Sequence, residues 1–321
     1  MLILEDGSEV IIKRRGRANI REQMKVMAFA AQRGTDAVVL ECMALHPELQ
    51  WISEHRIVRS TIGVITNIRD DHREVFPSGV DDMARSLSHT IPEGGLLVTG
   101  ATKYLDLFRA EATAKGSTAI LAVSEGEISP SKELDISWFE ENCAIALAVC
   151  ERLGVERERA LAGMVTAGKD LGALSVQRIS SANKRYTFVN AFSVNDPDTL
   201  VAVKEKLSSM GLLSPPVIAL VNCRADRPLR SVAFGAAMAR LLRPDRLVLI
   251  GEGVGIARRA AIRHGYDDNR IVTLGKGELE LVLAQLSLLV QEGATVIGTG
   301  NFHSLGARII NWLKEGRQDA G

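Results

Sequence analysis

Short apolar segments alternate with segments of helical periodicity along most of this sequence. Parallel strands need a crossover connection, usually a helix, and they are buried on both faces, so they read as continuous apolar runs. The first half contains four such runs: DAVVLECMA, TIGVITNI, GGLLVTG and STAILAV. The helices expected around them span residues 19–33, 78–90, 103–115, 137–152 and 156–166. This alternation predicts an α/β fold with a parallel sheet.

A second alternating series follows a stretch of different composition. The stretch TAGKDLGALSVQRISSANKR is rich in glycine, serine and charge, which predicts a linker. The later apolar runs are YTFVNAFS, PVIALVNC, RLVLIG, RIVTL and ATVIGTG, with helices expected at residues 198–210, 229–242, 254–265, 277–291 and 304–315. A chain of 321 residues is too long to fold around a single hydrophobic core. We therefore expect a domain over residues 1–170, a linker over 171–183 and a doubly wound, Rossmann-like domain over 184–321.

Local signals also mark the beginning of the chain. The stretch MLILEDGSEVIIKRRG predicts a hairpin of two strands around a DG turn. In the helix expected at 19–33, Asn19 can cap the first turn and Glu22 can complete a capping box with it. Gly34 follows the last helical residue and is expected to end the helix.

Composition excludes several classes of protein. Lys plus Arg and Asp plus Glu both number 39, so the formal net charge is zero and a general nucleic-acid or membrane-surface footprint is not expected. Aromatic residues make up 4%, too few for a platform that stacks single-stranded bases. The four cysteines form no CxxC pair and are expected to be buried free thiols, not zinc ligands. No apolar run reaches the ~18 residues of a membrane span, and no signal peptide is visible.

Polar side chains follow the apolar runs at the point where each predicted strand ends. In parallel α/β sheets, ligands bind at the carboxyl ends of the strands, so these positions are the candidates for a site. In chain order they are Glu41; Asn67, Asp70, Asp71 and His72; Asn195, Asp196 and Asp198; Arg224, Asp226 and Arg227; Asn301 and His303.

Glu41 and His72 end two successive strands that would lie side by side in a parallel sheet. A carboxylate and an imidazole can hold one divalent cation there, with phosphate oxygens and water as the other ligands. Carboxylates suit Mg²⁺, and the histidine also allows Mn²⁺. A simpler interpretation is that Asp70 or Asp71 only caps the following helix.

Other strand-end residues also have simpler interpretations. Asn195-Asp196-Pro197 could mark only the start of a helix, and the group from Arg224 to Arg227 could be a surface salt-bridge cluster. The glycine turn GEGVG is interpreted as a tight strand-to-helix turn. The phosphate cradle G-x-x-x-x-G-K-[ST] is not found in these 321 residues.

Two segments, NIREQMKVMAFAAQRGTDAVVLECMALHPELQ and TIGVITNIRDDHREVF, resemble the ligase subunit of poly-γ-glutamate synthase, a capsule-forming enzyme of bacteria. FVNAFSVNDPDTL, VIALVNCRADR and GTGNFHSLG continue the resemblance in the same order, over nearly the whole chain. That family belongs to the Mur ligase superfamily, which forms amide bonds with ATP. The resemblance implies a P-loop-type parallel-sheet ATPase domain, amino-terminally incomplete, over residues 1–170, and a Rossmann-like ligase domain over 184–321.

The resemblance implies an ATP-dependent acid–amino-acid ligase with ADP and phosphate as products. A glutamate γ-carboxylate would become an acyl phosphate, and the amine of the next glutamate would displace phosphate. Positioning and charge neutralisation are the main requirements of this chemistry. Glu41 and His72 match the family's metal-binding positions, with Asp71 as a third ligand and Asn67 beside them. The implied cofactors are ATP and Mg²⁺ or Mn²⁺.

The same resemblance assigns roles in the second half of the chain. Asp226 is expected to contact ribose, and Arg224 or Arg227 is expected to contact phosphates. Asn190 and Asn195 lie in the stretch after the first strand of that domain and are expected to be site residues. Glu41, His72, Asn195 and Arg224 are the catalytic candidates. The nucleotide-binding candidates are Asn190, Asp226, Arg227, Asn301 and His303.

The family also implies partners and a location. The substrates would be glutamate and the growing poly-γ-glutamate chain. Members work with a small integral-membrane subunit, so we expect a place at the cytoplasmic face of the bacterial membrane through that partner, and no nucleic acid.

The chain departs from the family in three ways. The family's amino-terminal anchor and its P-loop are not in this sequence, so we expect weak or no ATPase activity from the isolated chain. Ser175 stands where the family has an arginine in the linker, and Arg178 is a shifted substitute. Some members of the superfamily have a carbamylated lysine after the metal-binding histidine. The segment DDMARSLSHT that follows His72 contains no lysine, as in the poly-γ-glutamate branch. The alternatives are a non-catalytic scaffold or binding subunit derived from such a ligase, and a folate-type polyglutamate ligase.

Overall fold

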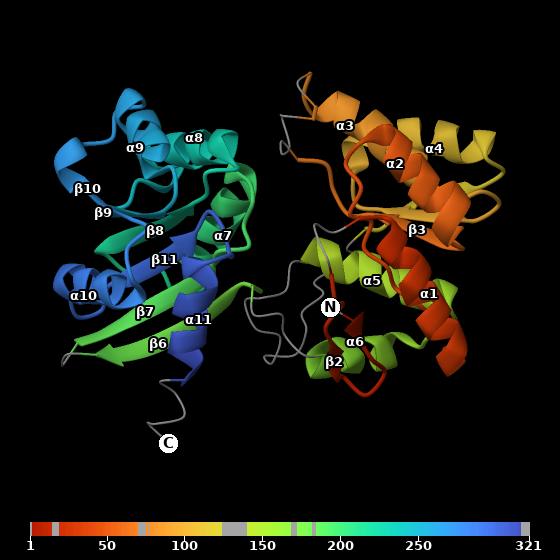
Figure 1. Ribbon diagram of the computed structural model, residues 1–321, viewed down its shortest axis with the longest axis horizontal. Helices are drawn as coiled ribbons and strands as arrows, with labels where there is room; N and C mark the ends of the chain where they lie inside the picture. The colour runs from red at the N-terminus through yellow and green to blue at the C-terminus, as the bar shows by residue number, and fades with distance from the viewer. Residues whose placement is uncertain are drawn as a thin grey trace. The chain divides into compact units, whose positions relative to one another are not determined.

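The computed structural model describes residues 2–14, 19–69, 75–76, 78–123, 140–167, 172–181 and 184–315. The chain divides into two compact units, one formed by Met1–Leu134 and Trp138–Gly168 and the other by Asp135–Ser137 and Lys169–Gly321. Each unit contains parallel sheet packed against helices, which confirms the predicted α/β fold class (Figure 1). None of the described helices has the length and apolar character needed to traverse a bilayer.

The first unit is built on a three-stranded parallel sheet in the order β3-β4-β5. Its strands are β3 (Ile62–Ile65), β4 (Leu96–Thr99) and β5 (Thr118–Leu121). Its helices are α1 (Arg21–Arg33), α2 (Pro47–Ile52), the π-helix η1 (Ser53–Val58), α3 (Val80–Leu87), α4 (Leu105–Ala114), α5 (Glu140–Arg152) and α6 (Arg157–Thr166). Two 3₁₀ turns, η2 (Ser88–Thr90) and η3 (Thr102–Tyr104), adjoin α3 and α4. Ile65, Leu97 and Phe108 belong to one buried cluster that joins this sheet to α4.

The N-terminal hairpin is confirmed, because β1 (Leu2–Ile3) pairs antiparallel with β2 (Glu9–Val10). The predicted capping box at α1 is wrong. Asn19 Oδ1 accepts a hydrogen bond from the N–H of Arg21, but Glu22 is buried and its carboxylate accepts from Arg14 Nε at 2.8 Å. Gly34 ends α1 as predicted, in the left-handed conformation with φ 68°.

The strand predicted at DAVVLECMA is also wrong, because this segment has no regular secondary structure and makes no strand pairing within the described part of the chain. Val39 is 99% exposed, and Cys42 is exposed where we expected a buried thiol. A run of apolar residues forms a buried strand only when a neighbouring strand satisfies its backbone and helices cover both faces. Cys143 and Cys223 are buried, as expected.

The second unit contains a six-stranded sheet in the order β10-β9-β8-β11-β7-β6. The strands are β6 (Ser175–Ser181), β7 (Lys184–Ala191), β8 (Val217–Cys223), β9 (Arg246–Gly251), β10 (Ile271–Gly275) and β11 (Thr295–Thr299). The last five are parallel and correspond to the five predicted strands. β6 is antiparallel to β7 and lies in the stretch expected to be a linker, so the linker prediction is wrong for residues 175–181.

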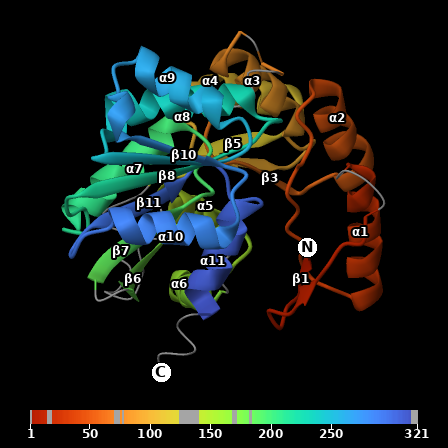
Figure 2. The same ribbon diagram turned by 60° about the vertical axis from the view of Figure 1, so that its left-hand side comes forward.

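Helices cover both faces of this second sheet, as a doubly wound fold requires. The helices are α7 (Pro197–Ser209), α8 (Pro228–Ala237) with the π-turn η4 (Met238–Leu242), α9 (Val254–Arg263), the 3₁₀ turn η5 (Asp268–Arg270), α10 (Leu279–Leu289) and α11 (Leu305–Glu315). Figures 1 and 2 show α8 and α9 on one face, and α10 and α11 on the other.

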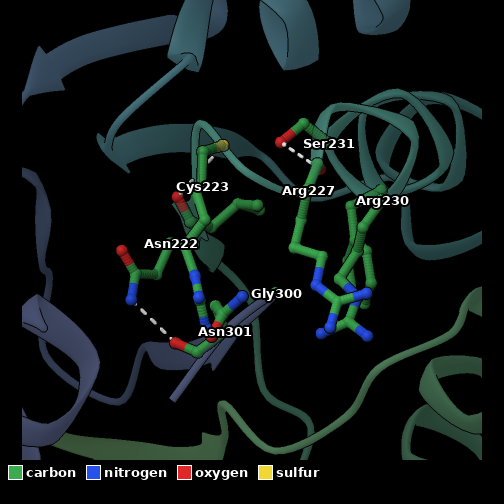
Figure 3. A pocket seen from close by; sticks show the side chains of 10 residues that line it. Asn222, Cys223, Arg227, Arg230, Ser231, Gly300 and Asn301 are labelled. Carbon is green, nitrogen blue, oxygen red and sulfur yellow. Dashed lines mark hydrogen bonds between the residues drawn. The ribbon is translucent and has the colours of Figure 1, made fainter. Parts of the chain in front are cut away.

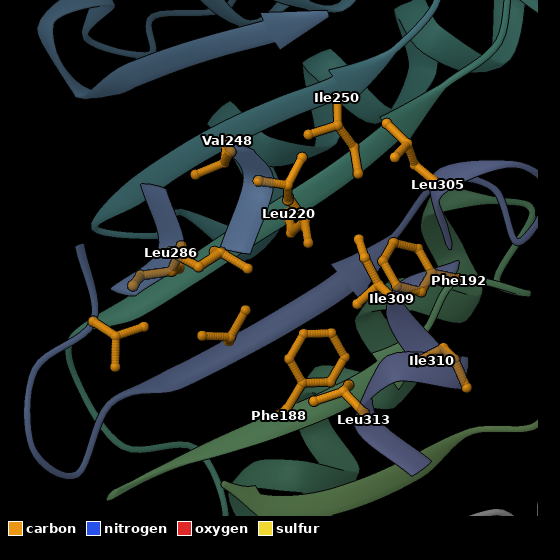
Figure 4. Close-up of a cluster of buried hydrophobic side chains, with 14 of the residues drawn as sticks. Phe188, Phe192, Leu220, Val248, Ile250, Leu286, Leu305, Ile309, Ile310 and Leu313 are labelled. Atoms are coloured by element: carbon orange, nitrogen blue, oxygen red, sulfur yellow. The ribbon is translucent and has the colours of Figure 1, made fainter. Parts of the chain in front are cut away.

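One buried hydrophobic cluster of the second unit lies between the sheet and α10 and α11 (Figure 4). Phe192 is fully buried there, and its ring lies so close to Gly298 that a Cβ on this glycine would come within 2.6 Å of it. The ring therefore packs directly on the β11 backbone, which explains why a glycine stands in the middle of a buried strand.

We expect Phe192→Ala to lower the free energy of unfolding by about 3–5 kcal/mol, because it leaves a cavity against β11. Chemical denaturation followed by circular dichroism measures this change. Leu288→Ala is the control, since Leu288 is 75% exposed on α10 and its loss should cost less than about 0.5 kcal/mol. Equal effects of the two changes would contradict this description of the core.

Candidate functional site

The carboxyl ends of β8 and β11 lie next to each other in the second unit. Residues 217–221 of β8 pair in register with residues 295–299 of β11. The residues that follow these strands therefore emerge at one edge of the sheet, as we predicted from their positions after apolar runs. Arg224 and Asn301 are brought within reach of each other, with 3.5 Å between Arg224 Nη1 and Asn301 Oδ1.

Asn222 joins the two strand ends. It is 3% exposed, and its Nδ2 donates to the carbonyl of Asn301 at 2.7 Å and to that of His303 at 2.8 Å. Gly300 has φ 94°, and a Cβ on it would lie 2.8 Å from the Asn222 carbonyl oxygen. The β11 turn can therefore approach β8 only with glycine at position 300.

Arg224 and Asp226 form a two-pronged ion pair at this edge. Arg224 Nε lies 2.8 Å from Asp226 Oδ1, and Arg224 Nη2 lies 2.6 Å from Asp226 Oδ2. The hydrogen bonds from Arg224 lower the pKa of the Asp226 carboxyl below its usual value. The salt-bridge interpretation thus holds for this pair.

Arg227 is the N-cap residue of α8 and Arg230 lies in its first turn; both line one hollow, and Figure 3 shows their side chains next to each other. Arg230 Nη1 donates to Asn195 Oδ1 at 2.8 Å. This contact brings the segment after β7 to the same place as the segments after β8 and β11. The N-terminal end of a helix carries partial positive charge, which adds to the two guanidinium groups and favours an anion.

These residues line a small hollow of about 10 Å³, which holds about one water molecule. A larger anion would therefore contact the arginines at the rim. Burial raises the pKa of the Cys223 thiol to about 11, so this lining residue is not a thiolate nucleophile near neutral pH. The lining residues are Val221, Asn222, Cys223, Arg224, Arg227, Arg230, Ser231, Phe234, Gly300 and Asn301.

The other candidate residues of this unit differ in burial and in the contacts that they make. Asn190 is 1% exposed, and its Nδ2 donates to the Ala173 carbonyl at 3.0 Å. Asp196 caps α7 through the N–H of Thr199, which confirms the helix-start interpretation. The side chain of His303 lies in an exposed turn. GEGVG is a tight turn in which Gly253 precedes α9 with φ 75°, as interpreted.

Arg178 does not lie at this edge. Ser175 pairs with Asn190 near the carboxyl end of β7, whereas Arg178 pairs with Thr187 three residues further along. Three residues of a strand span ~10 Å, which places Arg178 well down the sheet. Arg178 is therefore not a replacement for an arginine at position 175.

In the first unit, buried polar side chains hold the segment that carries Glu41. Gln23 Nε2 of α1 lies 3.5 Å from the Glu41 carbonyl oxygen, and Gln50 Nε2 of α2 donates to the Ala44 carbonyl at 3.1 Å. Gln50 is 1% exposed and accepts in turn from Ser86 Oγ of α3 at 2.7 Å. These contacts orient an irregular segment as strand pairing would orient a strand.

The predicted metal site can be located only in part. Glu41 is exposed, and Asp70, Asp71 and His72 lie outside the described residues. Among the residues that are described, no group of three or more His, Cys, Asp or Glu side chains is placed to share a metal ion.

Sequence reasoning missed Asn222 and Arg230. Arg230 follows Arg227 by three residues and comes just after a proline at the start of a helix, so the two side chains share one helical face. That spacing could have revealed Arg230. Asn222 ends an otherwise apolar strand, and a lone buried amide there could have indicated a backbone tie.

The comparisons with known sequences point to one family. The family model described as "Poly-gamma-glutamate synthase CapB C-terminal domain" matches residues 176–316. The chain is 30% identical over 317 residues to "Capsule biosynthesis protein CapB" of Bacillus anthracis, which covers 97% of this chain and 67% of that protein. It is 29% identical over 322 residues to "PGA synthase CapB" of Bacillus subtilis, which covers 98% of this chain and 80% of that protein.

Solved structures share the fold at low sequence identity. The bifunctional folylpolyglutamate synthase/dihydrofolate synthase from Yersinia pestis has a TM-score of 0.66 at 18% identity, over 90% of this chain and 69% of that one. The same enzyme complexed with AMPPNP and Mn ion has a TM-score of 0.60 at 17% identity, over 80% and 62%. MurF from Acinetobacter baumannii has a TM-score of 0.55 at 17% identity, over 84% and 64%.

We expect Gly300→Ala to destabilise the chain more than Gly293→Ala. Both glycines have positive φ, 94° and 78°, so both changes strain the backbone by about 1–2 kcal/mol. Only at Gly300 does the new Cβ meet the backbone of Asn222, whereas nothing lies within 4 Å at Gly293. Thermal unfolding of the two variants measures the difference, and equal losses would contradict the close approach.

We expect the pKa of Asp226 to lie below that of an ordinary aspartate and to return toward it in Arg224→Gln. Because the folded-state pKa is lowered, the pair stabilises the fold above the unfolded pKa, and this contribution is lost as pH falls through the folded pKa. The contribution is small because Asp226 is exposed. NMR titration of the Asp226 carboxyl tests this, and an unchanged value in the variant would contradict it.

Proposed function

Because the chain belongs to the CapB family of poly-γ-glutamate synthases, we propose that it is a ligase component that joins glutamate units through their γ-carboxyl groups at the expense of ATP. The observation that carries this proposal is the arginine-lined edge at the carboxyl ends of β8 and β11. It joins guanidinium groups to a helix N-terminus, a combination that suits phosphate groups.

The described contacts support a division of roles at this edge. Arg227 and Arg230 line the hollow at the N-terminal end of α8, so they are the residues proposed to receive phosphate oxygens. Asp226 keeps its role as the contact for ribose, since its carboxylate can accept from hydroxyl groups. Asn195 holds Arg230 in place, and Asn301 holds Arg224. Asn190 and His303 complete the nucleotide-binding set as predicted from sequence.

The proposed metal ligands are Glu41, Asp71 and His72 of the first unit. Two carboxylates and an imidazole suit Mg²⁺ or Mn²⁺, which would neutralise phosphate charge next to the reacting carboxylate. The Yersinia pestis enzyme of the same fold has been solved with AMPPNP and Mn ion, which supports this pairing of cofactors. Gln23 and Gln50 would act through the backbone of residues 41–44, as positioning residues for Glu41.

The proposed reaction has two balanced steps. The γ-carboxylate of one glutamate attacks the γ-phosphorus of ATP, which forms an acyl phosphate and releases ADP. The amine of the next glutamate then attacks the acyl carbon, the amide forms, the amine loses a proton and phosphate leaves. Growing poly-γ-glutamate would provide one of the two reactants, and a small integral-membrane partner would hold the complex at the cytoplasmic face of the membrane.

A second candidate is a non-catalytic binding subunit derived from such a ligase. The observation that favours it is Ser175 at the start of β6, with Arg178 too far along the strand to replace an arginine there. Nucleotide binding is the direct test, because it probes the arginine-lined edge itself.

The test is a calorimetric titration of ATP with Mg²⁺ into the chain and into the double variant Arg227→Gln/Arg230→Gln. We expect the double change to weaken ATP binding about tenfold or more, because it removes two charge-assisted contacts to phosphate. Arg258→Gln is the matched control, since Arg258 is an exposed arginine that pairs with Asp268 on another part of the same unit.

Three outcomes decide between the candidates. ATP binding by the unmodified chain that only the double variant weakens supports the ligase. ATP binding that both variants leave unchanged contradicts the arginine-lined site. No ATP binding by any form favours the non-catalytic subunit.

A further inference from the structure

The first unit contains a cavity that no part of the proposed reaction uses. It has a volume of about 480 Å³ and is lined by residues of α2 and η1, by Arg59 and Ser60 after η1, and by Glu93. This volume falls in the range of small-molecule sites, about 300–1,000 Å³. η1 is a π-helix, an uncommon form that occurs frequently at functional sites.

The acidic groups of this cavity are occupied by their own neighbours. Glu54 is 8% exposed, and its Oε1 accepts from Ser60 N–H at 2.8 Å and from Ser60 Oγ at 2.9 Å. Glu93 Oε1 lies 3.2 Å from His55 Nδ1. The other ring nitrogen of His55 lies 3.1 Å from the carbonyl oxygen of His89, so the imidazole is held at both ends.

The two arginines of the cavity are exposed, unlike Glu54. Arg56 lies over the ring of Trp51, with its Cζ 5.3 Å from the ring centroid, and both residues are exposed. Arg59 follows η1 in the left-handed conformation, with φ 51°, and is also exposed. Within the described ranges, neither arginine forms an ion pair with an acidic residue. The carboxylates of Glu54 and Glu93 thus have partners of their own, and the two guanidinium groups are what the cavity offers to an anion.

We infer that this cavity binds carboxylate groups of a γ-linked glutamate chain. A guanidinium group matches a carboxylate in shape and can bind it with two hydrogen bonds. A γ-linked chain carries one free α-carboxylate on each unit, and the Trp51 ring offers an apolar surface to the methylene groups between them. The choice of this anion rests on the proposed function, whereas the preference for carboxylate rests on Arg56, Arg59 and Trp51 alone.

The experiment is a calorimetric titration of a synthetic oligomer of γ-linked glutamate into the full chain. We expect binding that the double variant Arg56→Gln/Arg59→Gln weakens about tenfold or more. Arg109→Gln is the matched control, because Arg109 is an exposed arginine of the same unit that does not line the cavity. Circular dichroism confirms that the variants fold, which we expect since both arginines are exposed.

Other ligands distinguish the source of the negative charge. The same oligomer with its α-carboxyl groups converted to amides should not bind, and inorganic phosphate or ATP should bind no differently to the chain and to the double variant. An unaffected double variant, or equal binding of the amidated oligomer, overturns the inference. If ATP binding at the other site fails while the oligomer still depends on Arg56 and Arg59, the proposed ligase function fails and the cavity remains a carboxylate site.

Discussion

The parallel pairing of β8 with β11 is the constraint on which the candidate nucleotide site depends. Because the two strands run in register, their carboxyl ends stop at the same level. The Asn222 amide then ties both strand ends together, and Gly300 allows the backbones to approach closely. Arg224 and Asn301 are 77 residues apart in the sequence, and the pairing of β8 with β11 brings them together. The sheet converts distant positions into one charged edge.

The charges at that edge have unequal roles. Arg224 is compensated by Asp226, and that ion pair is exposed, so it adds little to stability. Arg227 and Arg230 lie at the start of α8, where the helix end adds partial positive charge of its own. Positive charge gathered at one edge favours an anion there, which is the basis of the proposed phosphate contact.

In the first unit, side chains and not a neighbouring strand hold the segment that follows residue 36. The segment after residue 36 is apolar enough for a buried strand, yet it has no strand partner among the described residues and leaves Val39 exposed. Its carbonyl groups at Glu41 and Ala44 are instead satisfied by side chains of Gln23 and Gln50. Buried amides of this kind cost free energy if a partner is lost, so they hold an irregular segment in one conformation.

The sequence by itself determined the α/β class, the five parallel strands of the second unit and the residues at their carboxyl ends, because apolar periodicity and strand-end polarity are local properties. Only the tertiary structure decided that residues 175–181 form β6, that residues 36–44 form no strand pairing with other described residues, and that Asn222 and Arg230 lie beside the candidate residues at one sheet edge. Whether a segment becomes a strand depends on a hydrogen-bonding partner elsewhere in the chain. Likewise, the contact of Arg230 with Asn195 depends on which loops meet at one sheet edge, and no local pattern encodes that.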